Sequence, residues 1–242
     1  MSTLLTALVR AHSRPRRLQL VLSQLDSYRK IPNLDVDILV LADRPTPAVL
    51  DVLRQAETDF GAFSRYSPVP VLDNNRERFL EAQNAHLEWL DFFASSPDWI
   101  YVVDDDFWIE PNSAHKALES TILARSDIDA YYMTCLFVQD SPNTYNPERQ
   151  HRSIRLYRHV PGARFSGTRM LSMPDEAHDA AIISRRTDDF PAPLLEYGGY
   201  SEADRATNLS NYARAGKSDP FTASLLSPRR EPLPSNYALL YP

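Results

Sequence analysis

The stretch of sequence that decides the fold is Trp99-Ile100-Tyr101-Val102-Val103-Asp104-Asp105-Asp106-Phe107-Trp108. Its first half is apolar, β-branched and aromatic, which is typical of a buried strand. Three adjacent carboxylates follow, and like charges at the edge of a core repel one another unless a cation lies between them. The stretch therefore predicts a strand that ends in a charged site.

A divalent metal is the simplest cation for such a site. Hard Mg²⁺ or Mn²⁺ binds carboxylate oxygens and keeps coordination positions open for phosphate. Ligands of open α/β sheets also bind at the carboxyl ends of the strands. The aspartates thus predict a metal-bridged phosphate ligand, and the alternative interpretation is a solvated, Asp-rich turn that only ends the strand.

Length and composition are those of an ordinary globular protein. The chain has 242 residues, of which 43% are hydrophobic and 24% charged, enough for one large domain or two small ones. The apolar runs are too short to span a bilayer, and the run at 4–9 is too short and wrongly flanked for a signal peptide. The single cysteine, Cys135, excludes an internal disulfide. We therefore expect a cytoplasmic protein.

Charge is unevenly distributed along the chain. The net charge of −6 argues against a protein whose whole surface binds nucleic acid. Residues 149–186, however, contain eight arginines and three acidic residues, so this segment carries +5 and the remainder −11. Such a segment is suited to a diphosphate, a sugar phosphate or a nucleic-acid backbone, and its other interpretation is a solvated charged surface.

Strand and helix patterns alternate over the first hundred residues. Strands are predicted at 4–10, 36–42, 69–72 and 99–103, and helices from Pro15 onward, over 49–60 and over 76–93. This alternation indicates βαβ units and a largely parallel sheet covered by helices on both faces. The predicted fold class is therefore α/β.

The pattern is less regular after the aspartates. A helix is predicted at 114–124, a strand at 129–138, a polar loop at 141–150, short strands at 154–157 and 180–184, and a helix at 201–215. Five prolines follow Gly216, which predicts an extended tail over 216–242. We expect one domain over 1–215, with a nucleotide-binding half at about 1–110 and an acceptor half at about 111–215.

The glycine content excludes several common sites. The chain has six glycines and none precedes Gly61, so the first strand-to-helix turn is neither a glycine-rich dinucleotide loop nor a P-loop. A Gly-x-Ser-x-Gly nucleophile elbow is also missing.

The order of features resembles the GT-A glycosyltransferases, most closely their large family 2. Four segments carry the resemblance: the opening strand and turn at 6–15, the strand with a terminal acid at 38–45, the Asp-x-Asp-like run at 102–106, and the acceptor-side pattern of 154–158, 162–167, His178-Asp179 and Gly199-Tyr200. The resemblance covers roughly residues 3–215. It implies a single GT-A domain with a Rossmann-like, mostly parallel sheet, and a metal-dependent transferase that uses a nucleotide-diphosphate sugar.

The resemblance also implies roles for individual residues. Asp106 and Asp104 would hold Mn²⁺ or Mg²⁺ at the diphosphate, with His178 as a further ligand. Contacts to the donor are assigned to Arg10, Asp43, Asn84, Asp104, Asp105, Arg155 and Arg158. The favoured donor is a UDP-sugar, and the transferred group a hexosyl or pentosyl residue.

An inverting transferase also needs a carboxylate base near the acceptor hydroxyl. By position in the resemblance this is Asp179, with Asp175 or Glu176 as alternatives that could instead cap a helix. Two departures from the family pattern are Asp179, where relatives carry Glu after the His, and Glu196-Tyr197, where many relatives carry His. A retaining enzyme would need no such base, and the sequence does not decide between them.

Two other classes remain open. One is a catalytically silent GT-A-like module that binds a glycan or nucleotide, which the Glu196-Tyr197 departure favours and the three aspartates disfavour. The other is an Asp-metal phosphoryl enzyme, which usually has its acidic pair after the first strand, where this chain has Arg10. For a transferase, the acceptor could be a glycan, a lipid, a protein or a hydroxylated nucleic-acid base, the last disfavoured by the net charge.

Overall fold

The structure is a computed structural model. It describes residues 2–11, 13–42, 45–61, 63–66 (backbone only), 84–85, 87–88, 90, 97–141, 143–161, 186–197, 201–202, 205–206 and 229–233.

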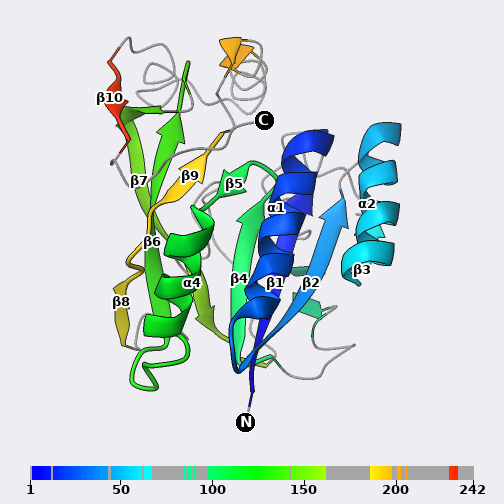
Figure 1. The fold of residues 1–242 in the computed structure, drawn as a ribbon, viewed down its shortest axis with the longest axis vertical. Coiled ribbons are helices and arrows are strands. Elements are labelled where there is room, and N and C mark those ends of the chain that lie inside the picture. The colour runs from blue at the N-terminus through cyan, green and yellow to red at the C-terminus, as the bar shows by residue number, and fades with distance from the viewer. Residues whose placement is uncertain are drawn as a thin grey trace.

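A mixed ten-stranded sheet forms the centre of the described structure (Figure 1). Its first half is parallel, in the order β3-β2-β1-β4: β1 (Thr3–Ala11), β2 (Leu34–Ala42), β3 (Phe63–Tyr66) and β4 (Trp99–Asp104). The second half continues from β4 through β7 (Thr144–Arg158), β6 (Ala130–Val138), β9 (Leu194–Glu196) and β5 (Phe107–Trp108), with β8 (Thr187–Asp189) on β6 and β10 (Glu231–Pro232) on β7. Among the described pairs, five are parallel and four antiparallel, which confirms the predicted α/β class with a mostly parallel sheet.

The core lies on both faces of this sheet. Alternate residues of β1 point to opposite faces: Val9 packs into the larger cluster beneath α1 (Pro15–Ser27) and α2 (Pro47–Phe60), whereas Leu8 packs with Leu87 and Leu90 of the described helical residues at 84–90. Figure 1 shows α1, α2 and α4 (Pro111–Ser120) together on one face of the sheet. The parallel half of the sheet thus has the layered architecture expected of βαβ units.

The strands predicted at 4–10, 36–42 and 99–103 and the helices predicted from Pro15 and over 49–60 agree with the structure in type and place, whereas most of the helix predicted at 76–93 lies outside the described residues. Pro15 stands in the first turn of α1, where its missing N–H costs no hydrogen bond. Thr46 caps α2, and Gly61 ends that helix with a φ of +59°, a conformation that glycine adopts without strain. The strand predicted at 69–72 lies outside the described residues, and the described strand in this part of the chain is β3.

The prediction of a loop at 141–150 is wrong, because strand β7 begins at Thr144 and runs for 15 residues. The prolines had indicated a loop, but the register against β6 jumps from Cys135↔His151 to Phe137↔Asn146. Pro147 therefore lies in an irregularity of the ladder, where its missing N–H is tolerated. Pairing on both sides of β7, with β6 and with β4 or β10, overrides the local turn preference.

The structure describes only some of the elements predicted after the aspartates. The helix predicted at 114–124 is α4, which begins at Pro111, is capped by the Glu110 carboxylate and ends at Ser120. Of the tail, Glu231 and Pro232 pair with Tyr145 and Thr144 of β7. Residues 180–184 lie outside the described part, as does most of 201–215.

Among the described residues, no helix is long and apolar enough to cross a membrane.

The core beneath α1 gives the first testable prediction. Leu18 is fully buried on α1, so Leu18→Ala leaves a cavity and should lower the free energy of unfolding by about 2–5 kcal/mol. Gln19, the next residue, is exposed, and Gln19→Ala should change it by less than about 0.5 kcal/mol. Urea unfolding followed by circular dichroism measures both, and equal effects would contradict the assigned faces of α1.

Candidate functional site

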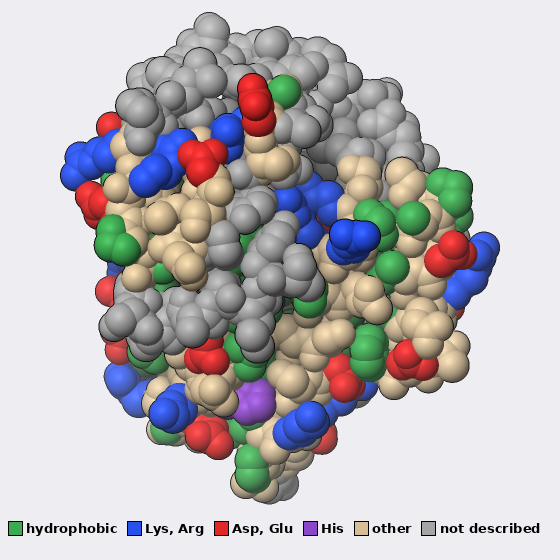
Figure 2. Space-filling model, turned by 45° about the horizontal axis from the view of Figure 1, so that its top comes forward, with side chains coloured by type: hydrophobic (Ala, Val, Ile, Leu, Met, Phe, Trp, Pro, Cys, Tyr) green, Lys and Arg blue, Asp and Glu red, His purple; other side chains and the backbone are tan. Residues whose placement is uncertain are grey.

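The three aspartates lie at the carboxyl end of β4, beside the end of β1. Arg10 of β1 is the register partner of Asp104, and the Asp105 N–H donates to the Arg10 carbonyl at 3.0 Å. This is the upper end of the sheet in Figure 1, where α1 begins. Figure 2 turns that end toward the viewer and shows basic side chains gathered near the middle of the face. The aspartates therefore occupy the place where α/β sheets bind ligands.

Asp104 is held by two arginines from neighbouring strands. One carboxylate oxygen pairs with the Arg10 guanidinium and the other accepts from Arg155 Nη1 at 3.2 Å. Arg155 comes from β7, is 4% exposed, and lies over the Phe107 ring with 4.5 Å to the ring centroid. Burial by itself would raise the pKa of Asp104, but Arg10 and Arg155 lower it, and the group stays ionised.

Asp105 and Asp106 both lie beside Arg14. The Arg14 guanidinium pairs with Asp106 and lies 3.6 Å from an Asp105 carboxylate oxygen. Both aspartates are buried, at 6% and 7% exposure. Buried carboxylates need cationic partners, because desolvation of an unpaired charge is costly. Arg14 supplies this charge from the residue that precedes α1.

The turn that carries the aspartates is also bound to β9. The Tyr197 N–H donates to the Asp106 carbonyl at 2.9 Å, and Glu196 is paired with Phe107 in the ladder. Burial, together with the negative charge of Asp106, raises the pKa of Glu196 to about 7. A carboxyl group that can hold a proton near neutral pH therefore stands beside the aspartates.

Strand β7 adds further polar side chains, among them Arg149, His151, Ser153 and Arg155. Ser153 and Arg155 lie together, because the Arg155 Nε donates to the Ser153 hydroxyl at 3.2 Å. Arg149 is 5% exposed and stacks over the Phe137 ring at 3.8 Å. Burial, followed by the charge of Arg155, lowers the pKa of His151 to about 4, so that this histidine is neutral at pH 7.

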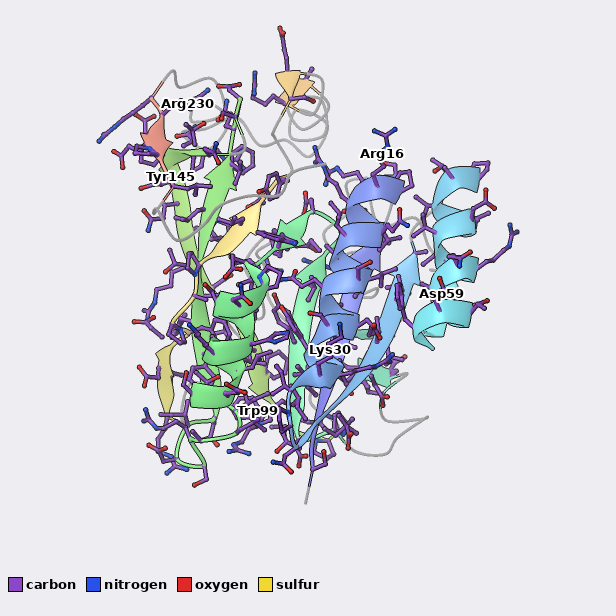
Figure 3. The ribbon with its side chains drawn as sticks, viewed as in Figure 1. Arg16, Lys30, Asp59, Trp99, Tyr145 and Arg230 are labelled. Atoms are coloured by element: carbon purple, nitrogen blue, oxygen red, sulfur yellow. The ribbon has the colours of Figure 1, made fainter. Side chains whose placement is uncertain are left out.

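The structure brings together four of the residues predicted to bind the donor: Arg10, Asp104, Asp105 and Arg155. It places Arg158 elsewhere, at the opposite end of β4. Arg158 lies over the Trp99 ring at 4.6 Å and donates to the Ile128 carbonyl at 3.0 Å (Trp99 is labelled in Figure 3). Asn84 is half-buried and belongs to the helical residues on the other face of the sheet.

The remaining predicted residues lie outside the described part of the chain: Asp43, Asp175, Glu176, His178 and Asp179. Two further residues, Arg14 and Glu196, were assigned no role from the sequence. Charge complementarity could have identified Arg14, because three buried acids at a strand end require cations from the adjacent turn. Glu196 carries the weaker signal of an acidic residue within an apolar strand, Leu194–Glu196.

The chemistry of the aspartates fits a hard divalent metal. Asp105 and Asp106 are adjacent, buried carboxylates that both lie beside the Arg14 guanidinium. In the described part of the chain, no group of three or more metal-ligating side chains converges into a cage. Mg²⁺ and Mn²⁺ sites in phosphate-binding proteins need only one or two carboxylates, because the substrate phosphates complete the coordination. The residues therefore fit a metal that is bound jointly with a diphosphate.

Comparison with known proteins identifies solved structures whose fold is similar to that of this chain. No protein-family profile matches the sequence, and no protein with a curated description matches it. The structure is similar to a mannosyltransferase from Pyrobaculum calidifontis solved with GDP-Man and Mn²⁺, with a TM-score of 0.53 and 13% identity over 93% of this chain and 69% of that one.

Two other solved structures are similar at lower scores. Residues 1–349 of TarS from S. aureus match with a TM-score of 0.48 and 11% identity, over 93% of this chain and 71% of that one. Glucosyl-3-phosphoglycerate synthase from Mycobacterium tuberculosis, with Mn²⁺ and UDP, matches with 0.36 and 16% identity, over 56% and 44%. The chain has a GT-A-like glycosyltransferase fold, as the sequence predicted.

The raised pKa of Glu196 predicts a pH-dependent stability. The folded protein keeps the Glu196 proton up to about pH 7, whereas the unfolded chain releases it near pH 4.5. The free energy of unfolding should therefore fall by roughly 1–3 kcal/mol as the pH rises from about 4.5 to 7, and Glu196→Gln should remove this slope.

Urea unfolding at a series of pH values, with a chelator present, measures this effect. The control is Glu57→Gln, at an exposed position of α2. Equal slopes in Glu196→Gln and the wild type would show that Glu196 titrates normally.

Proposed function

We propose that the chain is a metal-dependent glycosyltransferase that transfers a hexosyl or pentosyl group from a nucleotide-diphosphate sugar, with a UDP-sugar as the favoured donor, to a hydroxyl group. The observation that carries the proposal is the cluster of three aspartates at the carboxyl end of β4, in a GT-A-like sheet and surrounded by arginines. A solvated turn would leave the carboxylates exposed, but Asp105 and Asp106 are buried.

The metal is Mn²⁺ or Mg²⁺, and Asp106 would hold it together with the donor diphosphate and His178. Bound there, the metal would supply positive charge to the diphosphate leaving group. Asp104 has a different role in this proposal. Its two oxygens pair with Arg10 and Arg155, so it keeps both guanidinium groups at the site, and it would contact the ribose, or the metal through water.

The arginines would bind and orient the donor. Arg10 near the end of β1 and Arg155 within β7 are both fixed by Asp104, so their charges are in place before the diphosphate arrives. Electrostatic stabilisation by such preplaced charges avoids a reorganisation cost. Arg155 takes this role rather than Arg158, which lies at the other end of β4. Asp43 would accept hydrogen bonds from the base or ribose.

For an inverting reaction, Asp179 would remove the proton of the acceptor hydroxyl, with Asp175 or Glu176 as alternative bases. The acceptor is a glycan, a lipid, a protein or a hydroxylated nucleic-acid base. The arginine-rich segment at 149–186 is compatible with an anionic acceptor, whereas the net charge of −6 disfavours nucleic acid.

Nucleotide binding tests the class directly. Calorimetric titration with UDP, GDP, CDP and dTDP, with and without Mn²⁺, should give metal-dependent binding of one nucleotide. Asp106→Ala should weaken it at least about tenfold, because a metal ligand is lost. Asp59→Ala, at an exposed position of α2 labelled in Figure 3, is the matched control and should bind as the wild type does. Absence of binding by the folded wild type to all four nucleotides would contradict the proposal.

Turnover separates a transferase from a silent binding module. With the nucleotide-sugar identified by binding, Asp179→Asn should lower kcat by about 10²–10⁴-fold and leave nucleotide affinity unchanged, the loss expected for a general base. Asp175→Asn and Glu176→Gln serve as comparisons. Nucleotide binding without sugar release or transfer in the wild type would favour the silent module.

A further inference from the structure

A short segment late in the chain, residues 229–233, lies against the second half of the sheet. Its strand β10 pairs antiparallel with the first residues of β7, and the Leu233 N–H donates to the Asn143 carbonyl at 2.8 Å. Figure 1 shows β10 beside the outer end of β7. We call this segment the strap, because backbone hydrogen bonds hold it to a part of the sheet that precedes it by many residues.

Polar side chains also hold the strap. Arg230 donates to the Asp140 carboxylate at 2.6 Å, and the Tyr145 hydroxyl donates to the Glu231 carboxylate at 3.0 Å (Arg230 and Tyr145 are labelled in Figure 3). Asp140 also pairs with Arg205 at 2.6 Å. The Asp140 side chain is 43% exposed, and exposed ion pairs contribute little each to stability. These contacts therefore orient the strap, and its main anchor lies elsewhere.

The anchor is Leu233, which is 7% exposed. It belongs to an apolar cluster, separate from the larger core, whose other buried members are Leu136, Val138, Leu195 and Tyr197. Trp108 of β5 packs against the same cluster. Burial of a leucine side chain among apolar neighbours stabilises far more than an exposed ion pair does, so Leu233 is the residue that fixes the strap.

This cluster is bonded to the turn that carries the aspartates. The Tyr197 N–H donates to the Asp106 carbonyl at 2.9 Å, and the Tyr197 carbonyl accepts from Arg17 of α1 at 2.6 Å. Trp108 comes two residues after Asp106 and pairs with Leu195 in the ladder of β5 and β9. The aspartates are thus supported on their C-terminal side by β5 and β9, whose side chains share a cluster with the strap.

We propose that the strap positions the aspartates for their ligand. By filling the cluster that Trp108 and Tyr197 share, Leu233 keeps the turn at 104–106 in the place where the donor and its metal would bind. Leu233 is a positioning residue in this proposal, because it acts through Trp108 and Tyr197. The proposal rests on the proposed function for the identity of the ligand, whereas the placement of the turn can be measured without one.

Fluorine NMR of protein labelled with 5-fluorotryptophan measures that placement. The chain has three tryptophans, and Trp108→Phe identifies the resonance of Trp108. Leu233→Ala should shift or broaden this resonance, because it leaves a cavity in the cluster against which Trp108 packs. It should leave the resonance of Trp99, at the start of β4, in place.

The matched control is Leu34→Ala. Leu34 is buried like Leu233, at 3% exposure, but it lies at the start of β2 and pairs with Thr3, at the opposite end of the sheet from the aspartates. Both variants should lower the Tm, because each leaves a cavity. Only Leu233→Ala should change the Trp108 resonance.

Nucleotide affinity measures the consequence for the site. In calorimetric titrations with UDP, GDP, CDP and dTDP in the presence of Mn²⁺, Leu233→Ala should raise the dissociation constant of the nucleotide that the wild type binds by on the order of tenfold, the loss typical when the support of a metal site is removed. Leu34→Ala should change it less than about twofold. Leu233→Met, which nearly conserves the side-chain volume, should restore both the affinity and the Trp108 resonance.

An unchanged Trp108 resonance in Leu233→Ala overturns the proposal, and so does a nucleotide affinity that falls no further than in Leu34→Ala. If Leu233→Ala does not fold, Leu233→Val leaves a smaller cavity and is judged by the same two criteria. If the folded wild type binds none of the four nucleotides, the transferase proposal fails and the Trp108 resonance alone decides on the strap. Nucleotide binding that Leu233→Ala leaves at wild-type strength keeps the transferase and rejects the strap.

Discussion

Neutralisation of three adjacent carboxylates is the constraint on which this end of the protein depends. The arginines that meet it come from three separate elements: Arg10 from β1, Arg14 from the start of α1 and Arg155 from β7. Removing one partner of a buried ion pair is far more costly than never forming the pair, because the remaining charge stays desolvated. The carboxyl ends of β1 and β4 are thus bound by charge to a residue within β7 as well as by ladder hydrogen bonds, and β4 is the strand that pairs parallel with β1 and antiparallel with β7.

The same constraint explains how an acidic protein provides a site suited to a diphosphate. Net charge governs long-range steering, whereas recognition depends on charges within a few ångströms, where screening is weak. Around the aspartates the local balance is set by Arg10, Arg14 and Arg155, together with Glu196, whose raised pKa removes part of a negative charge near neutral pH. The overall charge of −6 is therefore no obstacle to an anionic donor, although it does disfavour a polyanionic partner covering the surface.

Prediction from sequence succeeded where structure is local. β1, α1, β2, α2 and β4 follow from the spacing of apolar residues, from Pro15 and from the charged end of β4. It failed at the first part of β7, whose polar sequence is ordered by pairing with the preceding strand β6 and with β10, which lies far away along the chain. Arg155 and Arg158 show the same limit within the site. The two are three residues apart and equally plausible as phosphate ligands, and only the register of β7 against β4 places one beside Asp104 and the other beside Trp99.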